Sequence, residues 1–336
     1  MKTKTYNTLY IMLAVLILAT GCTSNYKYKI GVSQCVGGRW REKANIEMLS
    51  AQHLYDTDVK VIIKNADNSN ERQCLQIDSL INEGVDLLVV SPNDYHALNG
   101  SLQRAREKNI PIVFFDRTTA MKDYTAYIGG DNIEAGRKMA EYAAMLCRDS
   151  VRTEGRQPIV LEMTGPLEIS PAAQRHKGFS EAISRYSDID YHHVPSKWSY
   201  DDCKRIMQEW LKEGNTVDVV FCHSDLAAIG AYEAAKKFHK ERDIHFIGID
   251  GLPGEGIDAV QKGQLSASYI YPTHGEEVIA LALRILEGKP FERVNNMKSF
   301  VVTPQNVADI SLSSNSLMKQ NQYLATIQSK LETYLG

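Results

Sequence analysis

Short apolar runs rich in β-branched residues alternate with longer amphipathic stretches along most of this chain, starting near Tyr28. Most of the runs are apolar at successive positions, as strands covered on both faces are, and the intervening stretches are long enough for crossover helices. This rhythm predicts a doubly wound, parallel α/β fold. The expected strands are 29–33, 59–63, 86–91, 111–115, 125–128, 159–163, 217–222 and 245–249. The expected helices are 40–54, 69–83, 95–108, 133–147, 172–186, 200–213, 226–238 and 276–287.

The length of the chain indicates two lobes rather than one. At 336 residues, the chain exceeds the size at which a single hydrophobic core usually stops growing. We expect a first lobe made of residues 27–130 and 272–298, and a second lobe made of residues 131–271 and 299–310. Three crossings of the chain, near 130–131, 271–272 and 299–302, would form a three-strand hinge between the lobes.

Charge and motifs argue against several classes of protein. The formal net charge is −3, and the 38 Lys and Arg residues are scattered without a basic stripe, so we expect no nucleic-acid partner. The sequence contains no phosphate-binding loop, zinc-protease motif or hydrolase nucleophile elbow. We therefore expect no cofactor, no metal site and no catalytic residues.

The first 22 residues have the shape of an export signal. Lys2 and Lys4 precede an apolar run from Leu9 to Ala19, which has about half the length that a membrane-spanning helix needs. Gly21 and Cys22 follow, where cleavage is expected. This stretch resembles a bacterial lipobox. The resemblance implies that residues 1–21 are a lipoprotein signal peptide and that Cys22 carries the lipid that anchors the protein to a membrane. The alternative is a soluble secreted protein with an incidental cysteine.

Polar and aromatic residues follow the expected strands. Ligands of doubly wound sheets bind beyond the carboxyl ends of the strands, so these residues are the candidates for a binding site. A sugar needs carboxylate and guanidinium groups to bridge its hydroxyls, and aromatic faces to cover the C–H surface of its ring. The candidates in the first half are Gln34, Arg39, Trp40, Ser91, Asn93, Asp94, Asp116 and Arg117. Those in the second half are Arg175, Trp198, His223, Ser224, Asp225 and Asp250.

Each candidate also has a structural interpretation when it is taken alone. Asp116 and Arg117 could form a surface pair, Trp40 and Trp198 could anchor the cores, and Asp250 could cap a helix. The repeated placement at strand ends favours one shared pocket, although it names no ligand.

A glycosidase is the enzyme class that these residues could suggest, because that reaction requires two carboxylates that flank a sugar. Asp116 and Asp250 would be the pair. We expect Arg117 and Arg175 to hold both carboxylates ionised, whereas a general acid needs a raised pKa. The sequence therefore favours a protein that binds a ligand and is not an enzyme.

From about Tyr28 to Thr303 the chain resembles the type 1 periplasmic binding proteins of the ribose- and galactose-binding kind. The stretches that carry the resemblance are 109–117 (NIPIVFFDR), 130–132 (GDN), 172–179 (AAQRHKGF), 221–225 (FCHSD) and 247–251 (IGIDG). The resemblance implies an exported protein that captures a monosaccharide, a pentose or a hexose such as fructose or ribose, in the cleft between its lobes.

By that resemblance, the residues that hold the sugar ring are Asp116, Arg117, Arg175, Trp198 and Asp250. Trp40 matches one of the two stacking aromatic residues of the family, and Arg39 stands where the other would be. Ser91 and Ser224 stand in place of two asparagines, and Tyr271 stands in place of a glutamine at the hinge. The implied ligand is a polyol ring whose stereochemistry these departures do not fix.

A closer resemblance is to the periplasmic sensor half of hybrid two-component regulators, which detect sugars released from polysaccharides. It rests on the stretches 29–35 (KIGVSQC), 40–43 (WREK), 70–73 (NERQ), 248–254 (GIDGLPG) and 267–272 (ASYIYP). Such sensors continue into a membrane helix and a histidine kinase, which we do not expect in the sequence up to Gly336. Two roles stay open. The chain is either a lipoprotein binder that serves an ABC-type permease or a sensor domain for a histidine kinase whose output segments are absent.

Residues 316–335 lie beyond the last strand of the family and are predicted to form a helix. Leu317, Leu324 and Leu331 recur every seven residues, which is typical of a seam between paired helices. Such a stripe also occurs on a helix that packs against its own lobe. A homodimer through this helix is therefore one of two interpretations.

Overall fold

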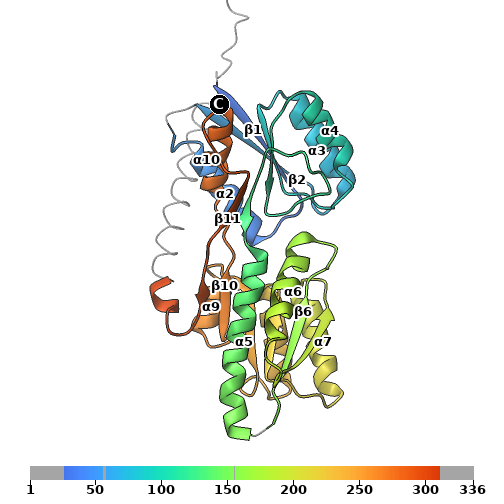
Figure 1. The fold of residues 1–336 in the computed structure, drawn as a ribbon, viewed down its shortest axis with the longest axis vertical. Helices are drawn as coiled ribbons and strands as arrows, with labels where there is room; N and C mark the ends of the chain where they lie inside the picture. The colour runs from blue at the N-terminus through green and yellow to red at the C-terminus, as the bar shows by residue number, and fades with distance from the viewer. Residues whose placement is uncertain (1–25, 56–57, 155, 311–336) are drawn as a thin grey trace, which may run out of the picture.

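The computed structural model describes residues 26–310 apart from 56–57 and 155, and it leaves the side chains of 149–154 undescribed. The predicted signal peptide 1–21, the predicted lipid attachment at Cys22 and the predicted helix 316–335 lie outside these residues. The described part forms two lobes along the long axis of the molecule, each built around one six-stranded sheet (Figure 1).

The first sheet has the strand order β11-β5-β4-β3-β1-β2, and all its pairings are parallel. Its strands are β1 (Tyr28–Gln34), β2 (Val59–Asn65), β3 (Leu87–Val90), β4 (Ile112–Phe115), β5 (Ala126–Gly130) and β11 (Val294–Met297). The second sheet has the order β12-β10-β9-β8-β6-β7 and is parallel except where β12 pairs with β10. Its strands are β6 (Ile159–Thr164), β7 (Asp190–Pro195), β8 (Val219–Cys222), β9 (His245–Asp250), β10 (Ala267–Ile270) and β12 (Val301–Val302).

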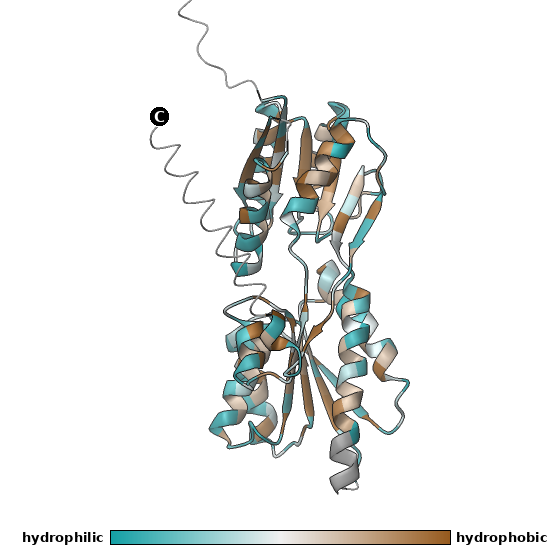
Figure 2. Ribbon diagram, turned by 90° about the vertical axis from the view of Figure 1, so that its left-hand side faces the viewer, coloured by the Kyte–Doolittle hydropathy of each residue, from teal (hydrophilic) through white to brown (hydrophobic). Residues whose placement is uncertain are grey.

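Helices enclose the sheets, and the strands are apolar on both faces. In β3, Leu87 and Val89 belong to one buried cluster while Leu88 and Val90 belong to another, and β8 divides its residues between two clusters in the same way. Figure 2 shows the apolar strands between the helices of each lobe. This two-sided burial confirms the predicted doubly wound fold.

The helices of the first lobe are α2 (Arg39–Ala51), α3 (Asn70–Asn82), α4 (Asn99–Glu107) and α10 (Gly275–Leu286). Those of the second lobe are α5 (Asn132–Glu154), α6 (Ser170–Ile183), α7 (Tyr200–Lys212), α8 (Asp225–Lys237) and α9 (Gly256–Gln261). None of these described helices is both long enough and apolar enough to cross a lipid bilayer.

Within the described residues the chain passes between the lobes three times. It leaves the first lobe between β5 and α5, returns between β10 and α10, and leaves again between β11 and β12. Helix α10 packs against α2 in the first lobe. The first lobe is therefore completed by a segment that comes after β6 to β10, which are strands of the second lobe, in the sequence. The residues next to these crossings lie where the two lobes meet.

The eight expected strands are all present, and four further strands were not predicted. Strand β7 contains Tyr191, His192 and His193 and is largely exposed at the edge of its sheet, so it lacks the apolar run that identifies a buried strand. Strand β10 is interrupted by Ser268, β11 has two asparagines at its centre, and β12 has only two residues. None of them has the continuous apolar run that identifies β3, β4 and β8, which are equally short or longer.

Two glycines allow α5 and α6 to approach closely. A Cβ atom at Gly136 would lie 2.1 Å from the carbonyl oxygen of Arg175, and one at Gly178 would lie 2.1 Å from the carbonyl oxygen of Ile133. Any other residue would push the helices apart. The contact therefore fixes the position of α6 and, with it, the backbone of Arg175.

Candidate functional site

Tyr271 lies at the second crossing and holds together residues of both lobes. Its hydroxyl donates a hydrogen bond to Asp116 Oδ1 at 3.0 Å and accepts one from Asn132 Nδ2 at 2.9 Å. Its backbone oxygen accepts from Trp40 Nε1 at 2.9 Å, and its backbone N–H donates to the oxygen of Asp250 at 3.0 Å. Strand-end residues that are far apart in the sequence therefore meet at the hinge.

Asp116 forms a buried ion pair that the sequence did not predict. Arg41 Nη2 binds Asp116 Oδ2, and Arg41 Nη1 donates to Gln34 Oε1 at 3.3 Å. The side chains of Arg41 and Asp116 are only 7% and 6% exposed. Arg41 lies inside α2 rather than directly after a strand, so placement at strand ends does not predict it as a site residue. The sequence feature that indicates Arg41 is its place next to Trp40 in the stretch WREK.

Arg175 and Trp198 share one backbone acceptor. Arg175 Nη1 donates to the carbonyl oxygen of His223 at 2.6 Å, and Trp198 Nε1 donates to the same oxygen at 2.9 Å. Arg175 Nε also donates to Asn132 Oδ1 at 2.9 Å, and its guanidinium lies 4.5 Å from the centre of the Tyr271 ring. Both side chains are thereby held beside the hinge by the second lobe.

Arg117 and Asp250 have hydrogen-bonding capacity that the described residues do not use. The Arg117 side chain is 11% exposed, and its buried Nε has no hydrogen-bond partner. Asp250 is partly buried, and its carboxyl group makes no hydrogen bond with the described residues. Buried ionisable groups normally find partners. These two groups, one from each lobe, therefore depart from the usual pattern within the described residues.

The surroundings of Arg117 are unfavourable for its charge. Burial lowers the pKa of Arg117, and the nearby guanidinium groups of Arg41 and Arg175 lower it further, which outweighs the opposing effect of the Asp116 carboxylate 3.9 Å from Nε. Arginine nevertheless stays protonated in proteins. The lowered pKa therefore reflects a free-energy cost of holding this cation among others, which acceptor atoms of a ligand would reduce.

The expectation that Asp250 is held ionised is wrong. Burial raises the pKa of Asp250 well above its ordinary value; Arg175 opposes this, but Asp225 and Glu255 raise the pKa further. No pattern in the sequence predicted that these acids would lie around Asp250. The carboxyl group is held towards its protonated form, in which it can donate as well as accept. Asp250 therefore has the raised pKa that a glycosidase needs in its general acid.

Three of the predicted ligand-binding residues have an unusual backbone conformation. Asp116, Trp198 and Asp250 have φ angles of 64°, 61° and 133°. Residues other than glycine seldom adopt positive φ, and bulky residues do so least. Such strain persists only where the surrounding structure enforces it, and it concentrates at binding and catalytic sites.

Arg39, also predicted to contact the ligand, spans the two lobes at the surface. Its Nη2 donates to the oxygen of Pro253 at 3.0 Å, and its Nη1 donates to the oxygen of Gly254 at 3.2 Å. Its Nη1 also lies 3.1 Å from Glu255 Oε1, and the side chain is 51% exposed. These contacts satisfy the guanidinium within the protein, and a direct contact with a ligand stays a prediction.

The two predicted serines are buried and already have contacts. Ser91 Oγ lies 3.7 Å from Cys35 Sγ at the end of β3. Ser224 is the N-cap of α8, and its Oγ accepts from the Ala227 N–H at 3.3 Å. A capping hydroxyl keeps its hydrogen free to donate. For both serines, a role in ligand binding stays a prediction.

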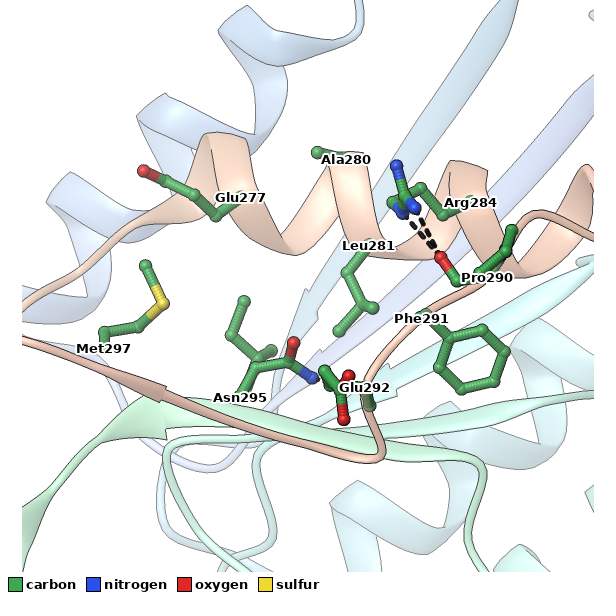
Figure 3. A pocket seen from close by; sticks show the side chains of 10 residues that line it. Glu277, Ala280, Leu281, Arg284, Pro290, Phe291, Glu292, Asn295 and Met297 are labelled. Atoms are coloured by element: carbon green, nitrogen blue, oxygen red, sulfur yellow. Dashed lines mark hydrogen bonds between the residues drawn. The ribbon is translucent and has the colours of Figure 1, made fainter.

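A separate groove of about 480 Å³ lies on the flank of the first lobe, between α10 and β11. Figure 3 shows its side chains, including Arg284, whose guanidinium donates to the oxygen of Pro290. Its charged residues Glu277, Arg284 and Glu292 are exposed, and none of the predicted site residues contributes to it. The lining residues of this β11 groove are Ile128, Glu277, Ala280, Leu281, Arg284, Pro290, Phe291, Glu292, Asn295 and Met297.

Two doubly wound lobes that meet at a cluster of strand-end polar residues define a two-lobed ligand-binding protein. A family model described as "Periplasmic binding protein domain" matches residues 31–290, and the chain belongs to this family. The match confirms the resemblance seen in the sequence, and a family of periplasmic proteins implies a periplasmic location.

Individual relatives bind several sugars, according to their names. The fructose-binding periplasmic domain of the hybrid two-component system BT1754 is 35% identical, with a TM-score of 0.82, over 90% of this chain and 99% of that chain. The ribose import binding protein RbsB of Salmonella typhimurium is 25% identical over 231 residues, which are 68% of this chain and 75% of the relative. The galactofuranose-binding protein YtfQ of Escherichia coli is 26% identical over 248 residues, 71% of this chain and 76% of the relative. These relatives are named as sugar-binding proteins and not as enzymes.

Asp225 allows a test of the electrostatics beside Asp250. It is fully buried, its Oδ2 accepts from the Gly251 N–H at 2.7 Å, and burial raises its pKa from 3.8 to about 7. Between those pH values the folded state binds more protons than the unfolded state. The contribution of Asp225 to the free energy of unfolding is therefore complete below about pH 4 and is lost as the pH rises to about 7.

Asp225→Asn should remove this dependence, because asparagine keeps an acceptor for Gly251 and cannot ionise. Relative to wild type, the variant should gain on the order of 3–4 kcal/mol of unfolding free energy between pH 4 and pH 7.5. Urea unfolding at a series of pH values measures this difference. Asp188→Asn, which changes an exposed carboxyl group, should show no such trend. If the difference in unfolding free energy between Asp225→Asn and wild type stayed constant with pH, the raised pKa of Asp225 would be contradicted.

Proposed function

We propose that this protein captures a monosaccharide between its two lobes. The proposal rests chiefly on Arg117 and Asp250, which come from opposite lobes and have hydrogen-bonding capacity that no described residue uses. Neighbouring hydroxyls of a sugar ring both donate and accept hydrogen bonds. One ring can therefore satisfy a guanidinium on one side and a carboxyl group on the other.

Trp40 and Trp198 supply aromatic surface for the C–H face of the sugar. The indole N–H of each ring is tied to a backbone oxygen, that of Tyr271 for Trp40 and that of His223 for Trp198. Rings held in this way lose little freedom when a ligand binds. The full proposed shell is Arg39, Trp40, Ser91, Asp116, Arg117, Arg175, Trp198, Ser224, Asp250 and Tyr271.

Closure of the lobes is the event that a partner would detect. Arg39 joins the first lobe to Pro253 and Gly254, and the Thr118 N–H donates to Ser170 Oγ of the second lobe at 3.3 Å. A sugar that contacts both lobes binds better when they are together than when they are apart. Binding therefore shifts the population towards the closed arrangement.

The relatives support a pentose or a hexose as the ligand, with fructose and ribose as the first candidates. Two partners fit this role: an ABC-type permease that imports the sugar, or a histidine kinase that signals its presence. The fructose-binding sensor domain is 35% identical to this chain and the ribose import protein 25%. The higher identity supports the sensor role.

Two further proposals concern the ends of the chain. Cys22 carries a lipid that anchors the protein to a membrane from the periplasmic side, and residues 316–335 form a helix that pairs with a second copy. Pairing would bring two binding units together, so that closure of the lobes could change how the two helices sit. Light scattering by the full mature chain and by one ending at Asn315 tests the pairing.

A glycosidase is the second candidate function, because the raised pKa of Asp250 is what a general acid requires. We favour binding without catalysis, since the relatives of this chain are sugar-binding proteins. Chromogenic glycosides incubated with concentrated protein distinguish the two functions. We expect no release of the chromophore above a heat-denatured control. Steady turnover that is lost in Asp250→Asn would overturn the proposal.

Four substitutions should abolish or greatly weaken sugar binding: Asp116→Ala, Arg117→Ala, Arg175→Ala and Asp250→Ala. Each leaves buried polar groups without partners, at a cost of about 2–5 kcal/mol. A sugar at a hundred times its dissociation constant stabilises the wild type by about 2.7 kcal/mol, so a thermal-shift screen with D-fructose, D-ribose, D-galactose and L-arabinose detects the loss.

Arg104→Ala is the matched control for these four variants, because its side chain is 52% exposed and pairs with Asp78 away from the hinge. It should respond to sugar as the wild type does. Wild-type affinity in all four folded variants would place the binding site elsewhere, with the β11 groove as the next candidate.

The lipid anchor predicts a modified amino terminus. Protein isolated from its native host should begin at an acylated Cys22 and partition into detergent, because several acyl chains together make anchoring stable. Cys22→Ala should remain unlipidated. Mass spectrometry of the mature amino terminus decides the question, and an unmodified Cys22 or a chain that begins at Thr23 would count against the anchor.

A further inference from the structure

One buried carboxylate contacts three elements of the second lobe. Glu162 lies in the middle of β6 and is 0% exposed. Its Oε1 is 2.8 Å from His223 Nε2, and its Oε2 is 2.8 Å from His176 Nδ1 and also accepts from the Tyr191 hydroxyl. These partners lie in the β8–α8 connection, on α6 and on β7. No sequence pattern predicted a role for Glu162.

The geometry defines which atoms donate in this network. His223 Nδ1 accepts from the Gly165 N–H at 3.1 Å, so the ring proton is on Nε2 and points at Glu162. Burial alone would raise the pKa of Glu162, but hydrogen bonds from His176, His223 and Tyr191 outweigh it and lower the pKa. The carboxylate is therefore ionised and accepts from three side chains at once.

Each partner of Glu162 lies on a segment that leads to, or bonds with, a residue of the proposed site. His176 follows Arg175 on α6. The carbonyl oxygen of His223 accepts from both Arg175 and Trp198. Tyr191 is on β7, and the connection from β7 to α7 carries Trp198. One carboxylate thus holds the three segments on which Arg175 and Trp198 depend.

We propose that Glu162 is a positioning residue, which fixes His176, His223 and Tyr191 and so sets the geometry of Arg175 and Trp198 and the affinity for the sugar. An apolar residue would fill this place in the strand without the desolvation of a charge. The effect on affinity rests on the proposed function, whereas the effect on geometry can be measured without any sugar.

Glu162→Met tests the proposal, because it keeps a similar volume and removes both acceptor oxygens. Glu162→Gln is the conservative rescue: its amide oxygen can accept from His223 while its amide N–H groups face His176 and Tyr191, which can both accept. Asp218→Ala is the matched control. Asp218 is a buried acid that directly precedes β8 and pairs with Arg156 at the far end of β6, so its removal should lower stability without altering the site.

The first readout is the indole N–H resonance of each tryptophan in the NMR spectrum of the sugar-free protein. The chain has three tryptophans. Trp40 donates to Tyr271 and Trp210 donates to Thr216, so both serve as internal references for Trp198. Glu162→Met should move the Trp198 resonance alone, Glu162→Gln should return it close to the wild-type position, and Asp218→Ala should leave it unchanged.

The second readout is the dissociation constant for D-fructose, or for whichever of D-ribose, D-galactose and L-arabinose stabilises the wild type most. Glu162→Met should weaken binding by about tenfold or more, and Glu162→Gln should recover most of the loss. If Glu162→Met does not fold, His176→Leu replaces it, since that side chain is 24% exposed; it should move the same resonance.

A Trp198 resonance that stays at its wild-type position in a folded Glu162→Met or His176→Leu variant would overturn the positioning role. If the Trp198 resonance moves while the affinity for the sugar stays unchanged, the proposed effect of Glu162 on sugar binding is overturned. If no sugar in the panel binds the wild type, the proposed function fails by itself, and the Trp198 resonance still decides whether Glu162 positions that residue.

Discussion

The hydrogen bond from the Tyr271 hydroxyl to Asp116 joins the hinge to the first lobe, and the rest of the proposed site is arranged around it. The same hydroxyl is held by Asn132, which in turn accepts from Arg175, so a chain of hydrogen bonds runs from the first lobe through the hinge into the second. Arg41 occupies the other oxygen of Asp116. The position of Asp116 is therefore determined by protein contacts, which makes the site preorganised rather than assembled by the ligand.

The charges near the hinge are only partly satisfied within the protein. Arg41 is paired with Asp116, and Arg175 donates to His223 and Asn132. Arg117 Nε has no hydrogen-bond partner in the part of the chain that the structure describes, while the pKa of Asp250 is raised by burial and by the acids beside it. A neutral ligand rich in hydroxyls suits such a site because it can accept from the guanidinium and bond to the carboxyl group without adding a charge.

The sequence predicted the layers of the fold well because strands buried on both faces carry an unmistakable apolar run. It missed β7, whose residues are polar because that strand lies at a sheet edge. In the candidate site, strand ends pointed to Asp116 and Asp250 but not to Arg41, which reaches Asp116 from within a helix. The ionisation of Asp250 was predicted wrongly because its carboxyl group becomes buried, with Asp225 and Glu255 nearby, only in the folded chain. The local sequence pattern predicts which strand or helix carries a side chain. Tertiary packing determines which charged groups surround that side chain.

A sugar bound between the lobes would use Arg117 and Asp250 together. A crystal structure of the protein with the sugar that stabilises it most tests this arrangement. We expect density for one ring that accepts a hydrogen bond from Arg117 Nε and bonds to the carboxyl group of Asp250. A sugar bound to one lobe alone, or bound in the β11 groove while both groups kept their unused capacity, would contradict it.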